Sequence, residues 1–280
     1  KTLKKIPLTM QKLHIGITGA TGSLGKELLK YKNRFKFIIF KGDIRSRTKL
    51  KLWFKKNQFD AVFHFAAVVP IKIVNNNKKR ALQVNYFGTK NIVDEICKNE
   101  INWFFFSSTS HVYSSSKKKI DENFKINPIS FYGKTKKLAE NYIIKKLKKK
   151  KIKYCIGRIF STTNKNQKKN YLVPDLKRRI KDTNGEIILQ NLNHYRDFIS
   201  IKDLAKIIIF LYKKKYEGVI NLGTGSATHL KNIAKIISKK YKKKVKFLDN
   251  KISTYLVADI SSLKRIYKFK LSKKIKEHIF

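Results

Sequence analysis

A tyrosine and a lysine at an i, i+4 spacing, Tyr132 and Lys136, are the residues of this chain best suited to proton transfer. They fall in a segment, 130–149, whose pattern predicts a helix, so both side chains would lie on one helix face. A nearby ammonium favours the tyrosinate and lowers the phenol pKa from about 10 toward neutrality, which makes Tyr132 a feasible acid or base. Because lysine is so abundant here, this spacing alone is weak evidence.

Hydroxyl side chains at the end of a predicted buried strand, 103–108, strengthen the interpretation. Ser107, Ser108 and Thr109 stand at the carboxyl end of that strand. In open parallel sheets, ligands bind at this end of the strands. We therefore expect a hydroxyl of this run to donate a hydrogen bond to a substrate oxygen close to Tyr132.

A glycine-rich turn follows the first predicted strand, 13–18, and precedes a helix predicted at 24–32. The turn has the form G-x-x-G-x-x-G. Its glycines permit a tight turn, close approach of the backbone to a pyrophosphate and close packing of helix on strand, and the helix start offers free N–H groups to the anion. The turn predicts a dinucleotide site made by Gly19, Thr21, Gly22, Ser23, Leu24 and Gly25.

The segment after the second predicted strand, 35–40, is expected to select the cofactor. Asp43 lies eighteen residues past Gly25, where an acid binds the adenosine ribose hydroxyls, whereas an arginine can bind a 2′-phosphate. Arg45 and Arg47 follow, and they could either hold a 2′-phosphate or face solvent. The sequence admits NADP or NAD, with NADP favoured.

Strand-like and helix-like segments alternate up to residue 160, with further strands at 61–66 and 153–160 and helices at 48–57 and 78–98. This alternation predicts an α/β fold with a doubly wound parallel sheet of the Rossmann type. After residue 161 the pattern loosens into short strands and three helices. We expect a disordered extension at 1–9, a dinucleotide-binding domain at 10–160 and a smaller α/β substrate-binding lobe at 161–280, interleaved with the first domain.

The chain carries 66 Lys and Arg against 18 Asp and Glu, a formal charge of +48. Lysine dominates, although arginine is the side chain that pairs bidentately with phosphate, and residues with AT-rich codons are abundant. We interpret the charge as a solvated surface set by base composition, which would also attract an anionic substrate. No specific nucleic-acid partner is expected. The alternative is a non-catalytic NAD(P)-binding regulator or an RNA-associated protein.

Other function classes are excluded by composition. The two cysteines, Cys97 and Cys155, form no C-x-x-C pair, which excludes a disulfide framework and suits a reducing cytoplasm. No metal site is expected from the histidine spacing. No apolar run reaches the ~18–20 residues of a membrane helix, so a membrane partner is not expected.

Together these motifs resemble the extended short-chain dehydrogenase/reductase family, the NAD-dependent epimerases, dehydratases and 4-keto reductases of nucleotide sugars. The resemblance runs from about Leu13 over nearly the whole chain, and it rests on 18–25, 42–45, 63–67, Asn85, 106–113, 132–136, 158–160, 196–198 and 221–223. It implies that Tyr132 is the general acid/base, that Lys136 is its partner and a ribose ligand, and that Thr109 with Ser108 binds the substrate oxygen.

The resemblance also implies hydride transfer at a sugar carbon, commonly C4, as net reduction or epimerisation, and it suggests a homodimer. The cofactor-binding residues it implies, besides the turn and the Tyr–Lys pair, are Asp43, Ile44, Arg45, Phe65, Ala66, Ala67, Asn85, Ser107 and Phe160. Those implied for the substrate are Thr109, His111, Tyr132, Ser161, Val173 and Arg196. Arg196 would hold the nucleotide diphosphate, and Asp197 would orient it. His64 is expected to be a core histidine.

Three departures from the family pattern carry expectations of their own. The motif at 42–45 resembles one that follows the family's third strand, so a strand–helix segment is expected to be missing, and Asp43 could then contact adenine rather than ribose. The 4,6-dehydratases have Asp-Glu after the catalytic threonine, whereas Ser110 and His111 stand here, which disfavours dehydration. Ser161 replaces a frequent asparagine, which changes a substrate contact.

Overall fold

The computed structural model describes residues 12–99, 101–165, 167, 170–248, 253–268, 270–272 and 275–280. The extension expected at 1–9 lies outside these ranges. Among the helices within them, none combines the length and the apolar character that a membrane span requires. The same ranges hold no group of three or more His, Cys, Asp or Glu side chains placed to bind a metal ion.

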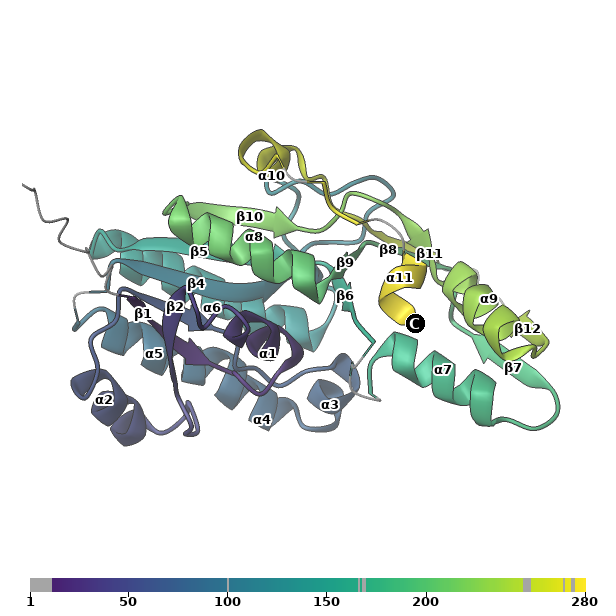
Figure 1. Ribbon diagram of the computed structural model, residues 1–280, viewed down its shortest axis with the longest axis horizontal. Helices are drawn as coiled ribbons and strands as arrows, with labels where there is room; N and C mark the ends of the chain where they lie inside the picture. The colour runs from purple at the N-terminus through teal and green to yellow at the C-terminus, as the bar shows by residue number, and fades with distance from the viewer. Residues whose placement is uncertain are drawn as a thin grey trace, which may run out of the picture.

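A six-stranded parallel sheet forms the centre of the molecule (Figure 1). Its strands lie in the order β10-β5-β4-β3-β1-β2, and every neighbouring pair is parallel. Their bounds are β1 Leu13–Thr18, β2 Phe35–Ile39, β3 Ala61–His64, β4 Trp103–Thr109, β5 Lys153–Ile159 and β10 Gly218–Leu222. The doubly wound α/β fold predicted from the alternating segments is confirmed.

Helices cover both faces of the sheet, and the strand residues alternate between two cores as the period of two requires. On one face, α1 (Ser23–Leu29) and α8 (Ile201–Lys213) pack in a core with Phe63 and Phe105. On the other, α2 (Arg47–Lys55), α5 (Thr89–Ile96) and α6 (Phe131–Lys149) pack against Phe104 and Phe106. Both cores are therefore built on neighbouring residues of β4.

Only β2 lies outside β1 on that side of the sheet, where a full Rossmann sheet has two strands. The chain passes from β2 through 40–46 directly into α2. This agrees with the missing strand–helix segment expected from the short spacing between the glycine turn and Asp43.

The helix expected at 78–98 is interrupted. The chain forms α4 (Lys78–Leu82), a π-helix at Gln83–Gly88 and then α5. Thr89 Oγ1 donates to the Asn85 carbonyl at 2.8 Å inside this wide turn. Such π turns recur at functional sites because they redirect a side chain, and here the turn contains the buried Asn85. A short helix, α3 (Ile71–Asn76), precedes it.

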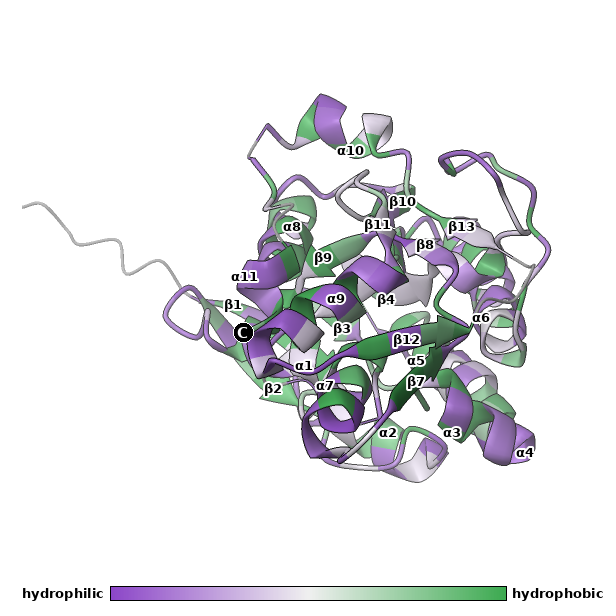
Figure 2. Cartoon of the chain, turned by 90° about the vertical axis from the view of Figure 1, so that its right-hand side faces the viewer, coloured by the Kyte–Doolittle hydropathy of each residue, from purple (hydrophilic) through white to green (hydrophobic). Residues whose placement is uncertain are grey.

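Beyond residue 160 the chain forms smaller sheets around a third core. The helices α7 (Leu172–Asp182) and α9 (Leu230–Tyr241) pack there, each with a hydrophilic and a hydrophobic side (Figure 2). The remaining elements are β6 Ser161–Thr163, β7 Ile187–Gln190, β8 His194–Arg196, β9 Phe198–Ser200, β11 Thr228–His229, β12 Val245–Leu248, β13 Thr254–Leu256, a 3-10 turn at Ser110–Val112, α10 Ser261–Ile266 and α11 Ile275–Ile279. Because β10 is a strand of the large sheet and α8 packs against that sheet, the domain boundary at 160 stays a prediction.

Candidate functional site

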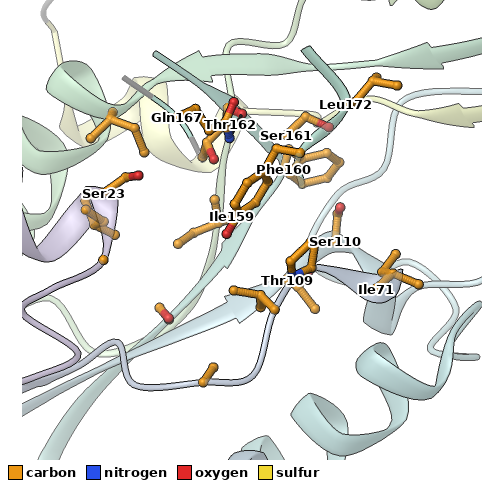
Figure 3. A pocket seen from close by; sticks show the side chains of 18 of the residues that line it. Ser23, Ile71, Thr109, Ser110, Ile159, Phe160, Ser161, Thr162, Gln167 and Leu172 are labelled. Carbon is orange, nitrogen blue, oxygen red and sulfur yellow. Dashed lines mark hydrogen bonds between the residues drawn. The ribbon is translucent and has the colours of Figure 1, made fainter. Parts of the chain in front are cut away.

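A pocket of about 570 Å³ lies at the carboxyl ends of the central strands. Figure 3 shows Ser23 on one side of it and Ile71 on the other, with Thr109, Ile159 and Phe160 between them. The sequence-predicted residues that line it are Gly19, Gly22, Ser23, Leu24, Gly25, Phe65, Ala67, Ser107, Ser108, Thr109, His111, Tyr132, Phe160, Ser161, Val173 and Arg196. The topology thus brings the glycine turn, the hydroxyls of β4 and the start of α6 together.

Seven predicted residues lie outside this lining: Thr21, Asp43, Ile44, Arg45, Ala66, Asn85 and Lys136. Conversely, sequence reasoning missed the segment 69–72 and Tyr171, which do line it. No local motif marks these residues. Residues 69–72 follow β3, and loops that follow parallel strands surround the ligand in such sheets. This general rule is the one signal in the sequence that could have placed them at the pocket.

The glycine turn meets the requirements of a close backbone approach. Gly19 has φ +74°, and a Cβ on it would lie 2.5 Å from the Ala66 amide nitrogen. A Cβ on Gly25 would lie 2.6 Å from Ala20 Cα. At Gly22, by contrast, the nearest atom to a Cβ is the Gly19 carbonyl oxygen at 3.3 Å. The outer two glycines are thus required by the fold, whereas the middle one leaves the backbone open toward the pocket, as a bound pyrophosphate requires.

Buried hydrogen bonds fix the framework behind this turn. His64 Nδ1 lies 2.6 Å from Thr18 Oγ1, and its Nε2 lies 2.8 Å from Thr89 Oγ1. Burial, with Lys136 nearby, places the pKa of His64 well below its usual value. His64 is therefore the satisfied core histidine expected from its strand.

Asn85 supports the loop that follows β3. Its Oδ1 accepts from the Val68 amide at 2.7 Å, and its Nδ2 donates to Thr135 Oγ1 at 3.2 Å. The amide thereby connects that loop to α6, the helix that carries Tyr132. Asn85 acts on the pocket through these two segments rather than by lining it.

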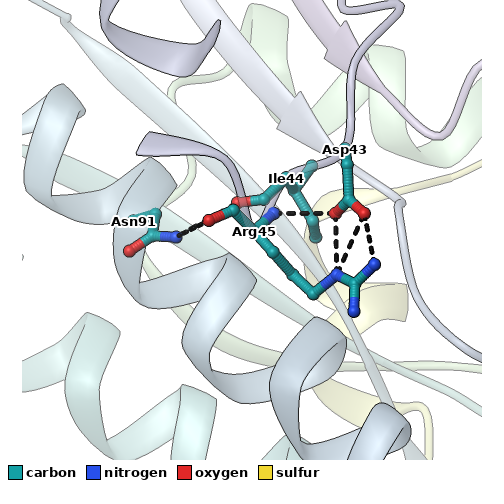
Figure 4. Close-up of polar contacts among 4 residues, drawn as sticks. All are labelled: Asp43, Ile44, Arg45 and Asn91. Carbon is teal, nitrogen blue, oxygen red and sulfur yellow. Dashed lines mark hydrogen bonds and ion pairs between the residues drawn. The ribbon is translucent and has the colours of Figure 1, made fainter. Parts of the chain in front are cut away.

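Asp43 and Arg45 form an exposed ion pair at the end of β2 (Figure 4). Arg45 Nη2 lies 2.6 Å from Asp43 Oδ2, and Nε donates to both carboxylate oxygens. This hydrogen bonding lowers the pKa of Asp43. Asn91 holds the loop by donating to the Ile44 and Arg45 carbonyls, and it accepts from Arg47 Nε at 3.0 Å. Arg47 is thus turned toward α5.

Tyr132 lies in the first turn of α6, whose start is capped by Ser130 accepting from the Gly133 amide at 3.0 Å. Burial, with Tyr171 nearby, raises the pKa of Tyr132 above its usual value. The expected lowering is therefore wrong for the polypeptide by itself. The reason is that desolvation of the phenol outweighs any effect of a nearby ammonium. Lys136 Nζ itself lies 4.1 Å from the centre of the Phe106 ring, and burial lowers its pKa to about 7.

Beneath Thr109, three polar side chains from separate elements meet out of contact with water. Ser108 Oγ donates to Glu140 Oε1 at 2.5 Å. Arg158 donates from Nη2 to Glu140 Oε2 at 2.9 Å and from Nε to Oε1 at 3.1 Å. All three side chains are buried. This cluster joins β4, α6 and β5 directly below the pocket.

His111 and Arg196 also line the pocket. Burial, with Arg196 nearby, lowers the pKa of His111 to about 4, so its imidazole is neutral near pH 7. Burial also lowers the pKa of Arg196 to about 10. Its Nη1 donates to Thr254 Oγ1 at 2.9 Å and to the Tyr195 carbonyl at 2.7 Å. The arginine is therefore held in place and remains cationic.

Asp197 does not orient Arg196, and that expectation is wrong. Its carboxylate accepts from the Thr224 hydroxyl at 2.6 Å and from the amides of Thr224, Gly225 and Ala258. The physical reason is that successive side chains of extended backbone point to opposite sides. Asp197 thus anchors the turn after β10 while Arg196 faces the pocket.

Comparisons with known proteins agree with this arrangement. The NAD dependent epimerase/dehydratase family matches residues 15–223. The chain is 26% identical over 221 residues to an uncharacterized membrane protein, MJ1061, of Methanocaldococcus jannaschii, and the match covers 69% of this chain but only 61% of that protein. It is 27% identical over 224 residues to GDP-6-deoxy-D-talose 4-dehydrogenase of Aggregatibacter actinomycetemcomitans, covering 76% of this chain and 75% of the relative.

Among solved structures, that of RMD from Pseudomonas aeruginosa complexed with NADPH is similar with a TM-score of 0.86. The match covers 96% of each chain at 18% identity. At this identity the likeness establishes the fold alone.

Proposed function

Because the chain belongs to the NAD dependent epimerase/dehydratase family, we propose that it reduces or epimerises a nucleotide-linked sugar at C4 with NADP or NAD. The observation that carries the proposal is that the glycine turn, Thr109 and Tyr132 line a single pocket. These segments lie far apart in the sequence, and their meeting puts a dinucleotide cradle beside a proton donor and a hydrogen-bond donor.

The nicotinamide, when bound, supplies or accepts the hydride. Tyr132 moves the proton at the reacting sugar oxygen, and Thr109 donates a hydrogen bond to that oxygen. Lys136 is proposed to hold the nicotinamide ribose and to favour the tyrosinate electrostatically. In the polypeptide alone its buried ammonium lies against the Phe106 ring.

Reduction or epimerisation is proposed in preference to dehydration because of the charges around the pocket. Among the residues that the structure describes there, none is an aspartate or a glutamate. Ser110 and His111 occupy the place that an acid pair would need, and the imidazole of His111 is neutral because its pKa is about 4. Removal of water from the sugar needs a carboxylic acid to protonate the leaving hydroxyl, and this lining provides none.

The same charges support an anionic substrate. Arg196 is proposed to bind the nucleotide diphosphate, as guanidinium groups bind phosphate oxygens in pairs. The similarity to GDP-6-deoxy-D-talose 4-dehydrogenase over three quarters of both chains supports a 6-deoxy sugar. Val173, His111 and Ser161, which line the pocket with Arg196, are proposed to complete the substrate site.

NADP is proposed as the preferred cofactor. Asp43 is the acid at the end of β2, and Arg45 already neutralises it. A ribose 2′-phosphate could replace the Asp43 carboxylate as the partner of the Arg45 guanidinium, whereas a ribose hydroxyl would have to compete with Arg45 for that carboxylate.

We also propose that the protein is located in the cytoplasm and that it assembles as a homodimer.

Turnover tests the proposal. The chain would be incubated with NADPH or NADH and a panel of nucleotide 4-keto-6-deoxy sugars, including the GDP-linked compound. We expect oxidation of the reduced cofactor with at least one member, and a loss of about 10²–10⁴-fold in kcat for Tyr132→Phe, which removes the acid/base. Full turnover by Tyr132→Phe would show that the acid/base is another residue.

Binding to RNA is the competing interpretation of the +48 charge. Affinity for RNA should fall steeply as salt is added, because it depends on counterion release. The increase in NADPH fluorescence on binding should change much less. RNA binding that weakens steeply with added salt, together with an absence of cofactor binding, would favour an RNA-associated protein.

A further inference from the structure

Ser108 and Thr109 are successive residues at the carboxyl end of β4, and both residues line the pocket. Sequence reasoning treats them as two donors to the same substrate oxygen. The contacts behind them are different, and the difference concerns where each hydroxyl proton points.

Ser108 has its proton committed to the protein. Its Oγ lies 2.5 Å from Glu140 Oε1. Glu140 is fully buried, and it is held by two hydrogen bonds from Arg158 and by Lys137 Nζ at 3.7 Å. A carboxylate paired with a guanidinium accepts only, so the serine must be the donor. A hydroxyl has one proton, and Ser108 therefore offers the pocket only its lone pairs.

Thr109 has the opposite arrangement. Its Oγ1 accepts from the His111 amide at 3.3 Å, which occupies a lone pair and leaves the proton to be donated. The Thr109 side chain is buried but faces the pocket. Thr109 is thus able to polarise a carbonyl oxygen, which accepts only.

We propose that Glu140 is a positioning residue that fixes Ser108 as a hydrogen-bond acceptor, so that Thr109 alone donates to the reacting oxygen while Ser108 receives a hydroxyl of the sugar. The proposal rests on the proposed function. It predicts a substrate that presents a carbonyl or alkoxide oxygen to Thr109 and a neighbouring hydroxyl to Ser108. It also gives a role to Arg158, which keeps the Glu140 carboxylate in place.

The position of Glu140 on α6 makes this arrangement rigid. Tyr132, Lys136 and Glu140 follow at intervals of four residues and share one helix face. Arg158 is in turn fixed by donating from Nη1 to the Glu122 carbonyl at 3.2 Å, and its guanidinium lies 4.8 Å from the centre of the Tyr113 ring. The serine thus meets a carboxylate that cannot readily turn away.

The first test compares single variants in kcat and KM. Thr109→Val should lower kcat by about 10²–10³-fold, the usual effect of removing one donor to a developing oxyanion. Ser108→Ala should leave kcat within about threefold and raise KM by about 2–10-fold, because a hydrogen bond made equally in ground and transition states is lost. Equal losses of kcat in both variants would overturn the proposal.

A second test uses a variant in which Ser108 no longer has the Glu140 carboxylate as its hydrogen-bond acceptor. The double variant Glu140→Leu/Arg158→Met replaces both partners of the pair by apolar groups of similar size, which avoids an unpaired buried charge. Ser108 would then be free to donate a hydrogen bond to the substrate. Adding Thr109→Val to this double variant should therefore lower kcat by only about 10-fold or less, whereas the same change lowers kcat by about 10²–10³-fold in the wild-type background. Glu140→Gln is the conservative control, since its amide oxygen can still accept the hydrogen bond from Ser108. In the Glu140→Gln background, Thr109→Val should again lower kcat by the full wild-type factor. An unchanged penalty in the double variant would contradict the proposal.

A third measurement needs no turnover. Ser108→Ala should lower Tm by several degrees in the wild type and by much less in the double variant, because groups in direct contact are not additive. Ser116→Ala is the matched control, since this buried hydroxyl donates to the Lys118 carbonyl at 2.6 Å and should cost the same in both backgrounds. If wild type turned over no member of the panel, the proposed function would fail, and this comparison would still decide whether Glu140 holds Ser108. Additive shifts would show that it does not.

Discussion

Two carboxylate–guanidinium pairs in this protein have the same chemistry and opposite surroundings. Glu140 and Arg158 meet at 2.9 Å with side chains that are 0% and 5% exposed. Asp43 and Arg45 meet at 2.6 Å with both side chains 45% exposed. Removal of water makes the first pair rigid and costly to break, whereas the second is screened by solvent and can exchange partners. One pair therefore fixes the geometry below the pocket, and the other is suited to contact with a ligand.

Breaking the buried pair should give the largest effect on stability. Arg158→Met leaves the Glu140 carboxylate buried without its guanidinium, which should lower the free energy of unfolding by about 3–5 kcal/mol. Urea unfolding followed by circular dichroism measures this. The double variant Glu140→Leu/Arg158→Met should recover most of the loss, because no charge is left unpaired. A double variant as unstable as Arg158→Met would show that packing, rather than the unpaired charge, explains the loss.

Lys136 extends the contrast between the two pairs, because its buried amino group lies against an aromatic ring. Burial lowers its pKa from 10.5 to about 7. The unfolded chain then binds the proton more readily, so the contribution of this residue to stability is complete above pH 10.5 and is lost as the pH falls from there to about 7. Lys136→Met should remove that part of the pH dependence and be more stable relative to wild type at pH 7 than at pH 10.

The control for this titration is the same pair of measurements on Lys137→Met. Lys137 is the next residue on α6 and its side chain is 25% exposed. Because this variant keeps Lys136, it should keep the part of the pH dependence that Lys136 causes. If Lys136→Met and wild type showed parallel stability curves between pH 7 and 10, the lysine would be charged throughout, and the buried environment would be more polar than the structure indicates.

The exposed pair should give the smallest effect on the fold and a selective effect on the cofactor. Arg45→Ala should raise the Kd for NADPH by about 10-fold, since a charge-assisted contact to phosphate is lost, and should leave the Kd for NADH nearly unchanged. Fluorescence titration measures both. Arg178→Ala, which breaks the exposed pair with Asp175 on α7, is the matched control and should change neither. Equal weakening for both cofactors would argue against a 2′-phosphate contact at Arg45.

Much of the fold and part of the site follow from local patterns. The alternation of strands and helices predicts the parallel sheet, and the glycine spacing predicts a turn whose outer glycines the fold requires. The short distance from that turn to Asp43 predicts the missing strand. These features depend on residues close in sequence, or on a period that one face of an element must satisfy.

Contacts between residues distant in sequence do not follow from local patterns. The expectation that Asp197 orients Arg196 is wrong because the partners of Asp197 lie on turns near residues 224 and 258. The break of the helix at 83–88 has no signal in the hydrophobic pattern. The residues 69–72 line the pocket only because β3 lies beside β1 in the sheet.

Residue types and their spacing specify which chemical groups this protein has and the order in which the chain presents them: a phosphate-cradling turn, a phenol with its lysine, and a row of hydroxyls. The protonation and hydrogen bonding of these groups are set by packing in three dimensions. Burial raises the pKa of Tyr132 instead of lowering it, and a carboxylate on α6 accepts the hydrogen bond that Ser108 donates. Desolvation and hydrogen-bond direction depend on which elements pack around a group, and no spacing along one chain can specify that.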